Sequence, residues 1–334
     1  QFETVTTMFG SMAAGGVFVP INPILKPEQV GHILRDCATK ILVTSPDRAR
    51  LLSDTLAECP DLTQVVVTGK DEPDRAQEHQ VPVCNWDQML DQAQTRQPEL
   101  RRIDSDMAAI LYTSGSTGRP KGVVLSHRNM LAGAESVASY LHNRADDRLL
   151  AVLPFSFDYG LSQLTTAFLH GASVVLMDYL LPRDVIRAVA RYRVTGLAAV
   201  PPLWNQLADL AWPDEAVECL RYLTNSGGAM AVTTTEQLQA ALPNTDIFLM
   251  YGLTEAFRST YLAPDLVASR PESMGKAIPN ADIMVVRPDG SECAADEPGE
   301  LVHRGALVAL GYWGDREKTD IRFKPVSYTH LRAH

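Results

Sequence analysis

The sequence predicts an α/β protein in which parallel sheets are flanked by helices, with a smaller β-rich part near the end of the chain. Up to about residue 255, short apolar runs alternate with amphipathic segments, which is typical of repeated strand and helix units. After Gly275 the pattern changes to shorter strands joined by the turn Arg287-Pro-Asp-Gly290. With 334 residues, of which 46% are apolar, the chain can bury a large core.

Each predicted strand is a short apolar run of the length that a buried strand has. These runs cover residues 41–44, 65–68, 81–84, 108–112, 149–153, 173–177, 197–200, 222–224, 248–251, 281–286 and 300–304. The predicted helices lie between the strands, and several have a proline in their first turn, where a helix needs no backbone N–H donor. They cover residues 27–37, 46–59, 129–141, 159–169, 182–192, 202–210 and 233–241. Residues 69–106 are polar and interrupted by prolines, so we expect a surface segment there with one short strand.

Charge and composition exclude several classes of function. The chain has 30 Lys and Arg against 40 Asp and Glu, and this net charge of −10 disfavours the broad basic surface that binds nucleic acid. The five cysteines have no C-x-x-C spacing, which predicts neither a zinc site nor a disulfide framework. No apolar run approaches the roughly 18 residues of a membrane span. We therefore predict a cytoplasmic protein with no nucleic-acid partner and no membrane span.

The most informative segment, residues 109–127, reads AILYTSGSTGRPKGVVLSH. An apolar strand is followed by hydroxyls and glycines, whose N–H and O–H groups can face anionic oxygens, and Lys121 adds a positive charge. The segment does not match the Walker A pattern, because Pro120 and Gly122 flank the lysine. It predicts a triphosphate-binding loop made of Thr113, Ser114, Gly115, Ser116, Thr117, Gly118 and Lys121.

Two later segments could complete a nucleotide site. In residues 225–230, Gly227, Gly228 and Ala229 follow a predicted strand, and such a turn lets a flat ligand approach the backbone. In residues 250–256, Tyr251 and Gly252 offer an aromatic face beside an open backbone, and Thr254 and Glu255 offer a phosphate contact and a magnesium ligand. Alternatively, Tyr251 is an ordinary core residue and Glu255 a charge at the start of a helix.

The loop resembles the signature T-S-G-S-T-G-x-P-K-G of the adenylate-forming superfamily, which contains acyl-CoA synthetases, the adenylation domains of nonribosomal peptide synthetases, and luciferases. Residues 299–313 resemble the family's G-E-L and G-Y-W segment, and the resemblance runs from Phe9 to Pro325 with the motifs in order. It implies that residues 1–325 are a partial AMP-binding large domain, with α/β layers in 1–274 and a β-rich subdomain in 275–325. More narrowly, residues 225–230, 251–260 and 275–280 resemble the exosortase A-associated acyl-CoA ligases of bacteria.

The resemblance also implies what the chain lacks. The family's ribose-binding aspartate, its hinge and its catalytic lysine lie beyond the position of Trp313, so we expect a fragment without the small C-terminal domain and with little activity of its own. Residues 326–334 follow Pro325 and resemble one reading frame of a sequencing-library adapter, so we expect a non-native tail.

The function implied is that of an ATP-dependent ligase, in which a carboxylic acid attacks the α-phosphate of ATP with Mg²⁺ to form an acyl-AMP and pyrophosphate. The acyl group then passes to coenzyme A or to the phosphopantetheine thiol of an acyl carrier protein. Lys121, Thr254 and Glu255 are the predicted catalytic residues. Two alternatives are an amino-acid-activating adenylation domain and a nucleotide-binding module without catalysis.

The predicted acid pocket includes Phe157 and Asp158. Phe157 stands where many acyl-CoA synthetases carry a histidine, and the pair resembles the Phe-Asp of peptide-synthetase adenylation domains, whose aspartate binds the α-amino group of the substrate. Alternatively, Asp158 is the N-cap of the helix predicted over residues 159–169, which we prefer because aspartate is a favoured N-cap residue.

Overall fold

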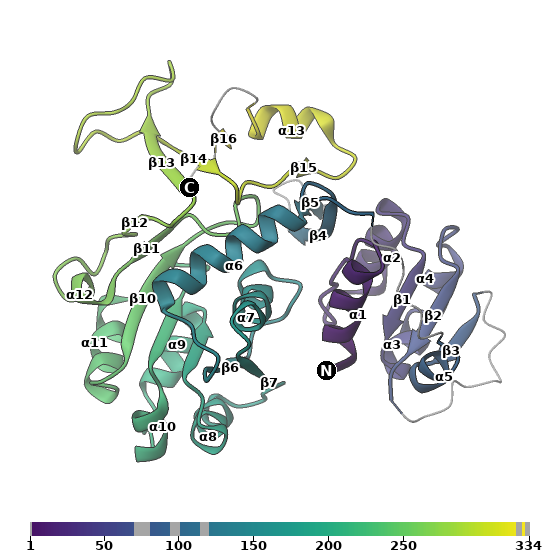
Figure 1. Ribbon diagram of the computed structural model, residues 1–334, viewed down its shortest axis with the longest axis horizontal. Coiled ribbons are helices and arrows are strands. Elements are labelled where there is room, and N and C mark those ends of the chain that lie inside the picture. The colour runs from purple at the N-terminus through teal and green to yellow at the C-terminus, as the bar shows by residue number, and fades with distance from the viewer. Residues whose placement is uncertain (1, 70–80, 94–100, 114–119, 325–328, 331–334) are drawn as a thin grey trace. The chain divides into compact units, whose positions relative to one another are not determined.

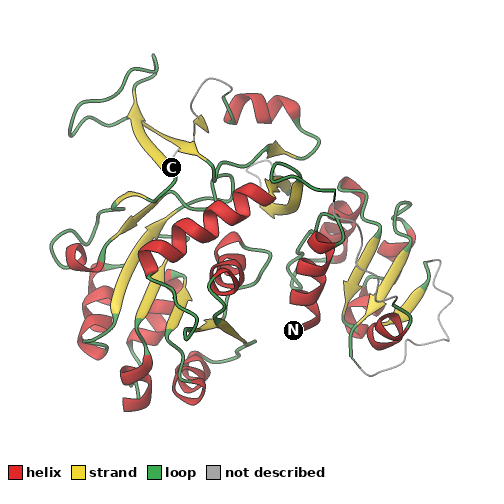
Figure 2. Cartoon of the chain, in the orientation of Figure 1, coloured by secondary structure: helices red, strands yellow, loops and turns green. Residues whose placement is uncertain are grey.

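The computed structural model describes residues 2–69, 81–93, 101–113, 120–324 and 329–330, and Figures 1 and 2 show the described helices and strands. The chain forms two compact units. The first contains residues 1–103 and 108–122, and the second contains residues 104–107 and 123–334. Among the described residues, no helix combines the length and the apolar character that crossing a membrane requires.

The first unit is built around a parallel sheet in the order β1-β2-β3. Its core contains Val30 and Leu34 of α2 and Val65 and Val67 of β2. Its elements are α1 (Phe2–Ala13), α2 (Pro27–Asp36), β1 (Ile41–Thr44), α3 (Pro46–Leu51), α4 (Ser53–Ala57), β2 (Gln64–Val67), β3 (Val83–Asn85), α5 (Trp86–Asp91) and β4 (Met107–Thr113).

Two predictions for the first unit are wrong. The helix expected over residues 46–59 is divided at Leu52, where φ is −92° and ψ is 0°, so that the buried side chain of Leu52 lies between α3 and α4. The segment expected to hold only a strand also contains α5, which begins after Asn85. The side chain of Asn85 accepts a hydrogen bond from the Asp87 N–H, as an N-cap residue does.

The second unit contains a sheet of seven strands in the order β12-β11-β10-β9-β8-β6-β7. The five strands from β10 to β7 are parallel, as predicted, and β11 and β12 continue the sheet antiparallel. The strands are β6 (Arg148–Ala151), β7 (Ser173–Leu176), β8 (Gly196–Ala199), β9 (Tyr222–Asn225), β10 (Asp246–Tyr251), β11 (Thr260–Leu262) and β12 (Lys276–Ala277).

Helices cover both faces of this sheet (Figure 1). Successive strand residues point to opposite faces, so each strand packs against helices on both sides. Leu149 of β6 packs with Ala167 of α7, whereas Leu150 belongs to the core that Trp204 of α9 and Leu238 of α11 share. The helices of this unit are α6 (His127–Leu141), α7 (Asp158–Leu169), α8 (Pro182–Tyr192), α9 (Pro201–Ala208), α10 (Asp214–Cys219), α11 (Val232–Ala241) and α12 (Pro264–Val267). The prediction of a parallel sheet flanked by helices is therefore confirmed.

The end of the chain is rich in short strands, as predicted. β13 (Ala281–Val286) pairs antiparallel with β14 (Glu300–Gly305), and β14 pairs with β16 (Thr329–His330). β15 (Gly311–Tyr312) pairs antiparallel with the second half of β5 (Lys121–Ser126), and α13 covers Arg316–Arg322. β12 lies after residue 275 but belongs to the large sheet through β11, so the large sheet extends into the segment assigned to the β-rich part.

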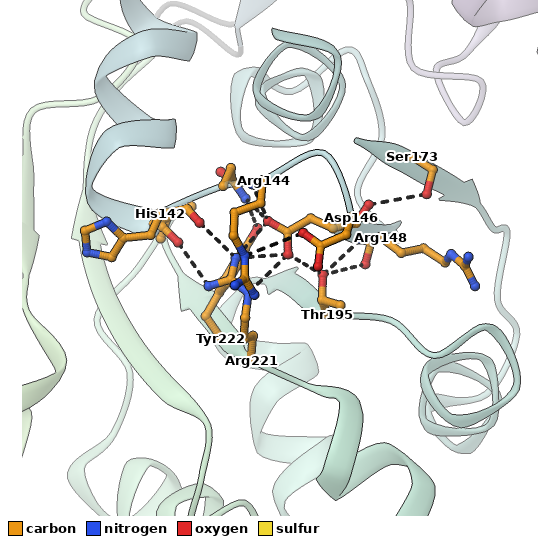
Figure 3. A network of polar contacts seen from close by, with 11 residues as sticks. His142, Arg144, Asp146, Arg148, Ser173, Thr195, Arg221 and Tyr222 are labelled. Atoms are coloured by element: carbon orange, nitrogen blue, oxygen red, sulfur yellow. Dashed lines mark hydrogen bonds and ion pairs between the residues drawn. The ribbon is translucent and has the colours of Figure 1, made fainter. Parts of the chain in front are cut away.

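A buried ion pair joins the amino ends of three strands in the large sheet (Figure 3). Asp147, which precedes β6, accepts hydrogen bonds from Arg221 before β9 at 2.7 Å and from Thr195 before β8 at 2.8 Å. It also accepts bonds from the Arg144 N–H at 2.8 Å and from Asn143 at 3.2 Å. Burial opposes ionisation, but the hydrogen bonds from Arg221, Arg144, Thr195 and Asn143 together outweigh it and lower the pKa of the Asp147 carboxyl. The charges therefore hold this edge of the sheet together.

Candidate nucleotide and acid site

Most of the predicted site residues gather at the opposite edge of the large sheet, where its parallel strands end. Residues 225–230 follow β9 and residues 251–256 follow β10, and these two strands are paired in parallel from Asp246 and Tyr222 to Leu249 and Asn225. Ligands of open α/β sheets bind at this carboxyl edge. The structure therefore brings together the two segments expected to contact the adenine and the α-phosphate.

Close packing fixes the turn after β10. Phe257 is fully buried with a left-handed φ of 58°, which is strained for a residue with a side chain. Its ring lies against Gly133 of α6, where an added Cβ would be 2.5 Å from Cδ1 of Phe257. A Cβ at Gly252 would be 2.9 Å from Cα of Arg258. The two glycines thus let α6 and the chain itself approach the turn and hold its backbone in place.

Glu255, the predicted magnesium ligand, is half-buried in this turn. Its Oε1 accepts a hydrogen bond of 2.6 Å from the Tyr312 hydroxyl, and its carbonyl accepts one of 2.8 Å from the Ala309 N–H. The alternative that Glu255 is a helix charge is wrong, because no helix begins there. Burial and the bond to Glu255 raise the pKa of the Tyr312 hydroxyl, which therefore stays a donor at neutral pH.

The carboxylate of Glu255 suits a magnesium ion that is held mainly by phosphate oxygens. The described residues contain no group of three or more His, Cys, Asp or Glu side chains arranged to hold a metal. Magnesium in nucleotide sites is commonly bound by one or two carboxylates together with phosphate oxygens and water. Tyr312 orients one oxygen of Glu255, and the ion would take the other.

The glycine turn after β9 is open. Gly227, Gly228 and Ala229 are exposed, and Asn225 Nδ2 donates a hydrogen bond of 2.9 Å to the Gly228 carbonyl. Tyr251 at the end of the neighbouring strand is half-buried, so it is not an ordinary core residue. Burial raises the pKa of its phenol, and nearby Arg322 opposes that shift. An exposed backbone and a partly exposed aromatic ring thus end two adjacent strands.

Phe157 and Asp158 lie at the start of α7, also at the carboxyl edge. The ring of Phe157 lies beside the glycine turn, because a Cβ added to Gly227 would be 3.4 Å from Phe157 Cζ. Asp158 is 3% exposed, and its Oδ1 accepts a hydrogen bond of 3.2 Å from the Thr254 hydroxyl. Predicted residues that are separate in the sequence therefore meet in one place.

The preferred interpretation of Asp158 as an N-cap is wrong. The helix begins one residue earlier than predicted, so Asp158 is its first residue and Phe157 is the cap, without a side-chain hydrogen bond. The carboxylate of Asp158 turns inward to Thr254. Burial raises the pKa of the Asp158 carboxyl, while Arg258 and the Thr254 bond lower it and partly offset that effect.

Sequence reasoning missed Arg258, which is a buried cation in the same place. Arg258 is 1% exposed, its Nη1 donates a hydrogen bond of 2.7 Å to Ser226 after β9, and its guanidinium lies 4.7 Å from the ring centroid of Tyr159. The signal in the sequence was an arginine two residues after the predicted nucleotide segment of residues 250–256.

The phosphate loop is described only at its ends. Thr113 is the last residue of β4 and Lys121 is the first residue of β5, and both are half-buried. Ser114, Gly115, Ser116, Thr117 and Gly118 lie outside the described residues. The roles predicted for this loop therefore stay predictions.

His303 of β14 is another buried polar residue whose pKa is shifted by burial. It is fully buried, and its Nδ1 lies 3.0 Å from the hydroxyl of Ser259, the residue between Arg258 and the start of β11. Burial lowers the pKa of this imidazole to about 4, although the negative charge of Asp282 opposes the shift. The folded protein thus holds His303 neutral at physiological pH.

We expect His303 to make the protein less stable in mild acid. Because the unfolded imidazole has the higher pKa, the unfolded state binds more protons, and stability is lost as the pH falls towards the folded pKa of about 4. His303→Gln should therefore reduce the loss of unfolding free energy between pH 7 and pH 5 by about 2 kcal/mol. Urea unfolding at the two pH values measures this difference, and His170→Gln at an exposed site is the control. Equal pH dependence in all three proteins would contradict the expectation.

Comparison with known proteins identifies relatives over nearly the whole chain. A family model described as AMP-binding enzyme matches residues 1–313. The chain is 32% identical to L-proline--[L-prolyl-carrier protein] ligase of Streptomyces coelicolor, over 97% of this chain and 61% of the relative. It is 30% identical to 4-coumarate--CoA ligase 2 of Oryza sativa subsp. japonica, over 95% of this chain and 58% of the relative. The chain thus spans about three fifths of the length of either relative.

The fold also matches solved structures over nearly the whole chain. The anthranilate CoA ligase AuaEII in complex with anthranoyl-AMP superposes with a TM-score of 0.88 at 25% identity, over 99% of this chain and 63% of that one. These matches confirm the broad resemblance that the sequence motifs indicate. They do not confirm the narrower resemblance to the exosortase A-associated ligases, which stays a prediction.

Proposed function

The chain belongs to the AMP-binding enzyme family, and we propose that it provides the nucleotide and acid site of an ATP-dependent ligase that joins a carboxylic acid to a thiol. The observation that carries this proposal is the meeting of three segments at one sheet edge. Tyr251 ends β10 beside the open Gly227 turn, and the Thr254 hydroxyl binds Asp158 of the acid-side helix α7. A nucleotide whose adenine binds Tyr251 and the Gly227 turn would have its α-phosphate near Thr254 and the acid.

The reaction proposed has two steps. A carboxylate oxygen of the acid attacks the α-phosphorus of ATP, the bond from that phosphorus to the bridging oxygen breaks, and pyrophosphate leaves. A thiol then attacks the acyl carbon, loses its proton to solvent, and displaces AMP. The thiol is that of coenzyme A or of a carrier-protein phosphopantetheine, and relatives with either acceptor in their names match the chain.

The chain's own residues supply positioning and charge. Tyr251 stacks on the adenine, and the backbone of residues 227–229 lies along it. Thr254 positions the α-phosphate, and Glu255, oriented by Tyr312, would hold a magnesium ion, whose charge would neutralise the phosphates. The loop of residues 113–118 and Lys121 bind the β- and γ-phosphates. Nucleotidyl transfer depends chiefly on such positioning and charge stabilisation.

Amino-acid activation is the second candidate function, and Asp158 is the observation in its favour. A buried carboxylate next to the acid site could bind the ammonium group of an amino acid, and the prolyl-carrier protein ligase among the relatives is named for an amino acid. The two candidates share the adenylation step and differ only in the acid that they activate.

The adenine site can be tested by binding of a stable acyl-AMP mimic, propionyl sulfamoyl adenosine. We expect the chain to bind the mimic, and Tyr251→Ala to weaken binding by about 10- to 100-fold, because stacking of a base on an aromatic side chain contributes ~1–3 kcal/mol. Isothermal titration calorimetry measures both affinities. Tyr192→Ala, at an exposed tyrosine of α8, should leave binding unchanged. Equal affinity of the Tyr251 variant and the parent would place the adenine elsewhere.

A further inference from the structure

Arg258 has buried N–H donors that form no hydrogen bond with the residues that the structure describes. Its Nη1 donates to Ser226, but Nε and Nη2 are buried and have no hydrogen-bond partner among the described residues. A guanidinium stays charged in a protein, so these N–H groups cannot be removed by deprotonation. Burying unpaired donors of a cation is costly, and an acceptor that arrives with a ligand removes that cost.

The surroundings place Arg258 beside the residues of the proposed acid site. Its guanidinium lies on the ring of Tyr159, the residue that follows Asp158 in α7, and its backbone belongs to the same turn as Thr254. Thr254 in turn donates to the Asp158 carboxylate. Arg258 and Asp158 are thus two buried side chains of opposite charge near the turn that carries Thr254, whose hydroxyl we expect beside the α-phosphate.

The positive charge of Arg258 near Asp158 affects which substituents on the acid can bind at the proposed site. An isolated buried carboxylate gains a counter-charge when an ammonium group binds, whereas here the positive charge of Arg258 already offsets part of the effect of burial on Asp158. A second cation would also meet the repulsion of the guanidinium. A hydroxyl or keto oxygen, by contrast, can accept hydrogen bonds from Nε and Nη2 without adding charge.

We propose that Arg258 is a specificity-determining residue, which makes the pocket select acids that carry a hydroxyl or keto oxygen on the carbon next to the reacting carboxyl over the corresponding amino acids. This inference rests on the proposed function, because it concerns the acid that the same site adenylates. It also implies that Asp158, whose carboxylate accepts a hydrogen bond from Thr254, does not bind an amino group of the substrate.

Three matched mimics test the proposal: the lactyl, propionyl and alanyl sulfamoyl adenosines, which differ only in a hydroxyl, a hydrogen or an ammonium group. We expect the chain to bind the lactyl mimic at least tenfold more tightly than the alanyl mimic, with the propionyl mimic between them. In Arg258→Met, the lactyl mimic should lose its advantage over the propionyl mimic, and the alanyl mimic should become the tightest ligand. Calorimetric titrations of the three mimics with each protein give the affinities that this comparison needs.

Two further variants distinguish a specific role of Arg258 from misfolding and from a nonspecific effect of removing an arginine. Arg258→Lys keeps a buried cation but loses the fork of donors, so it should still disfavour the alanyl mimic while losing the preference for the lactyl mimic. Arg191→Met removes an exposed arginine that lies 5.3 Å from the ring centroid of Tyr192, and it should leave the order of affinities unchanged.

The outcomes separate the two proposals. If the unmodified chain binds the alanyl mimic most tightly, or binds the lactyl and propionyl mimics equally, the inference about Arg258 is wrong while the adenylate site stands. If Arg258→Met weakens all three mimics by the same factor, Arg258 is structural only. If none of the mimics binds, the proposed function fails, and the inference fails with it.

Discussion

Lys121→Ala and Glu255→Gln should each reduce kcat/KM for adenylation by about 10²- to 10³-fold, which corresponds to the loss of ~3–4 kcal/mol of transition-state stabilisation. Lys121 is expected to lie against the β- and γ-phosphates that leave as pyrophosphate, where no other lysine of the loop can replace its charge. Glu255→Gln keeps the shape of the side chain but removes the charge that binds magnesium, so the Mg²⁺ concentration for half-maximal rate should rise.

The measurement is acid-dependent exchange of labelled pyrophosphate into ATP by the protein translated from the complete gene. Lys40→Ala is a matched control, because the exposed ammonium of Lys40 pairs with Asp61 at 2.7 Å in the first unit and has no role in the proposed site. Unchanged kinetics in both site variants would show that the ATP site lies elsewhere.

Asp147→Ala should lower the free energy of unfolding by about 3–5 kcal/mol, because it leaves a largely buried arginine without its counter-charge. The substitution removes the acceptor of Arg221, Thr195 and Asn143 at once, and these residues join the amino ends of β6, β8 and β9 (Figure 3). Asp147→Asn should cost less, because the amide oxygen still accepts some of these bonds.

The neighbouring residue provides the control for this prediction. Asp146 also forms an ion pair, with Arg144 at 3.6 Å, but its side chain is 78% exposed. Exposed pairs contribute little, so Asp146→Ala should change the unfolding free energy by less than about 1 kcal/mol. Urea unfolding at pH 7 measures both variants, and similar losses in the two would contradict the role assigned to the buried network.

The large sheet could be predicted from the sequence because each strand is a compact apolar run. Leu149 and Leu150 show why: both faces of β6 are covered by helices, so both residues must be apolar. The division of the helix at Leu52 could not be predicted, because every residue around it is compatible with a helix. Only the packing of the Leu52 side chain in the first unit's core decides that break.

The site was partly predictable for a similar reason. Tyr251, Thr254 and Glu255 lie in one short segment, and their residue types alone indicate a nucleotide site. The local sequence was therefore sufficient to select them as candidates. The Tyr312 hydroxyl contacts Glu255 from 57 residues away, and Ser226 contacts Arg258 from 32 residues away, so these partners became visible only in the fold. Asp158 was misassigned because an aspartate before an apolar run is typical of an N-cap, and its true partner, Thr254, is 96 residues distant.

The central claim is that this site forms an acyl-AMP, and acid-dependent exchange of pyrophosphate into ATP tests it most directly. The protein translated from the complete gene should incorporate label only when a carboxylic acid and Mg²⁺ are both present, and the rate should depend on the acid supplied. Binding of ATP without exchange, across a panel of aliphatic, aromatic, hydroxy and amino acids, would contradict the claim and would instead indicate a nucleotide-binding module without catalysis.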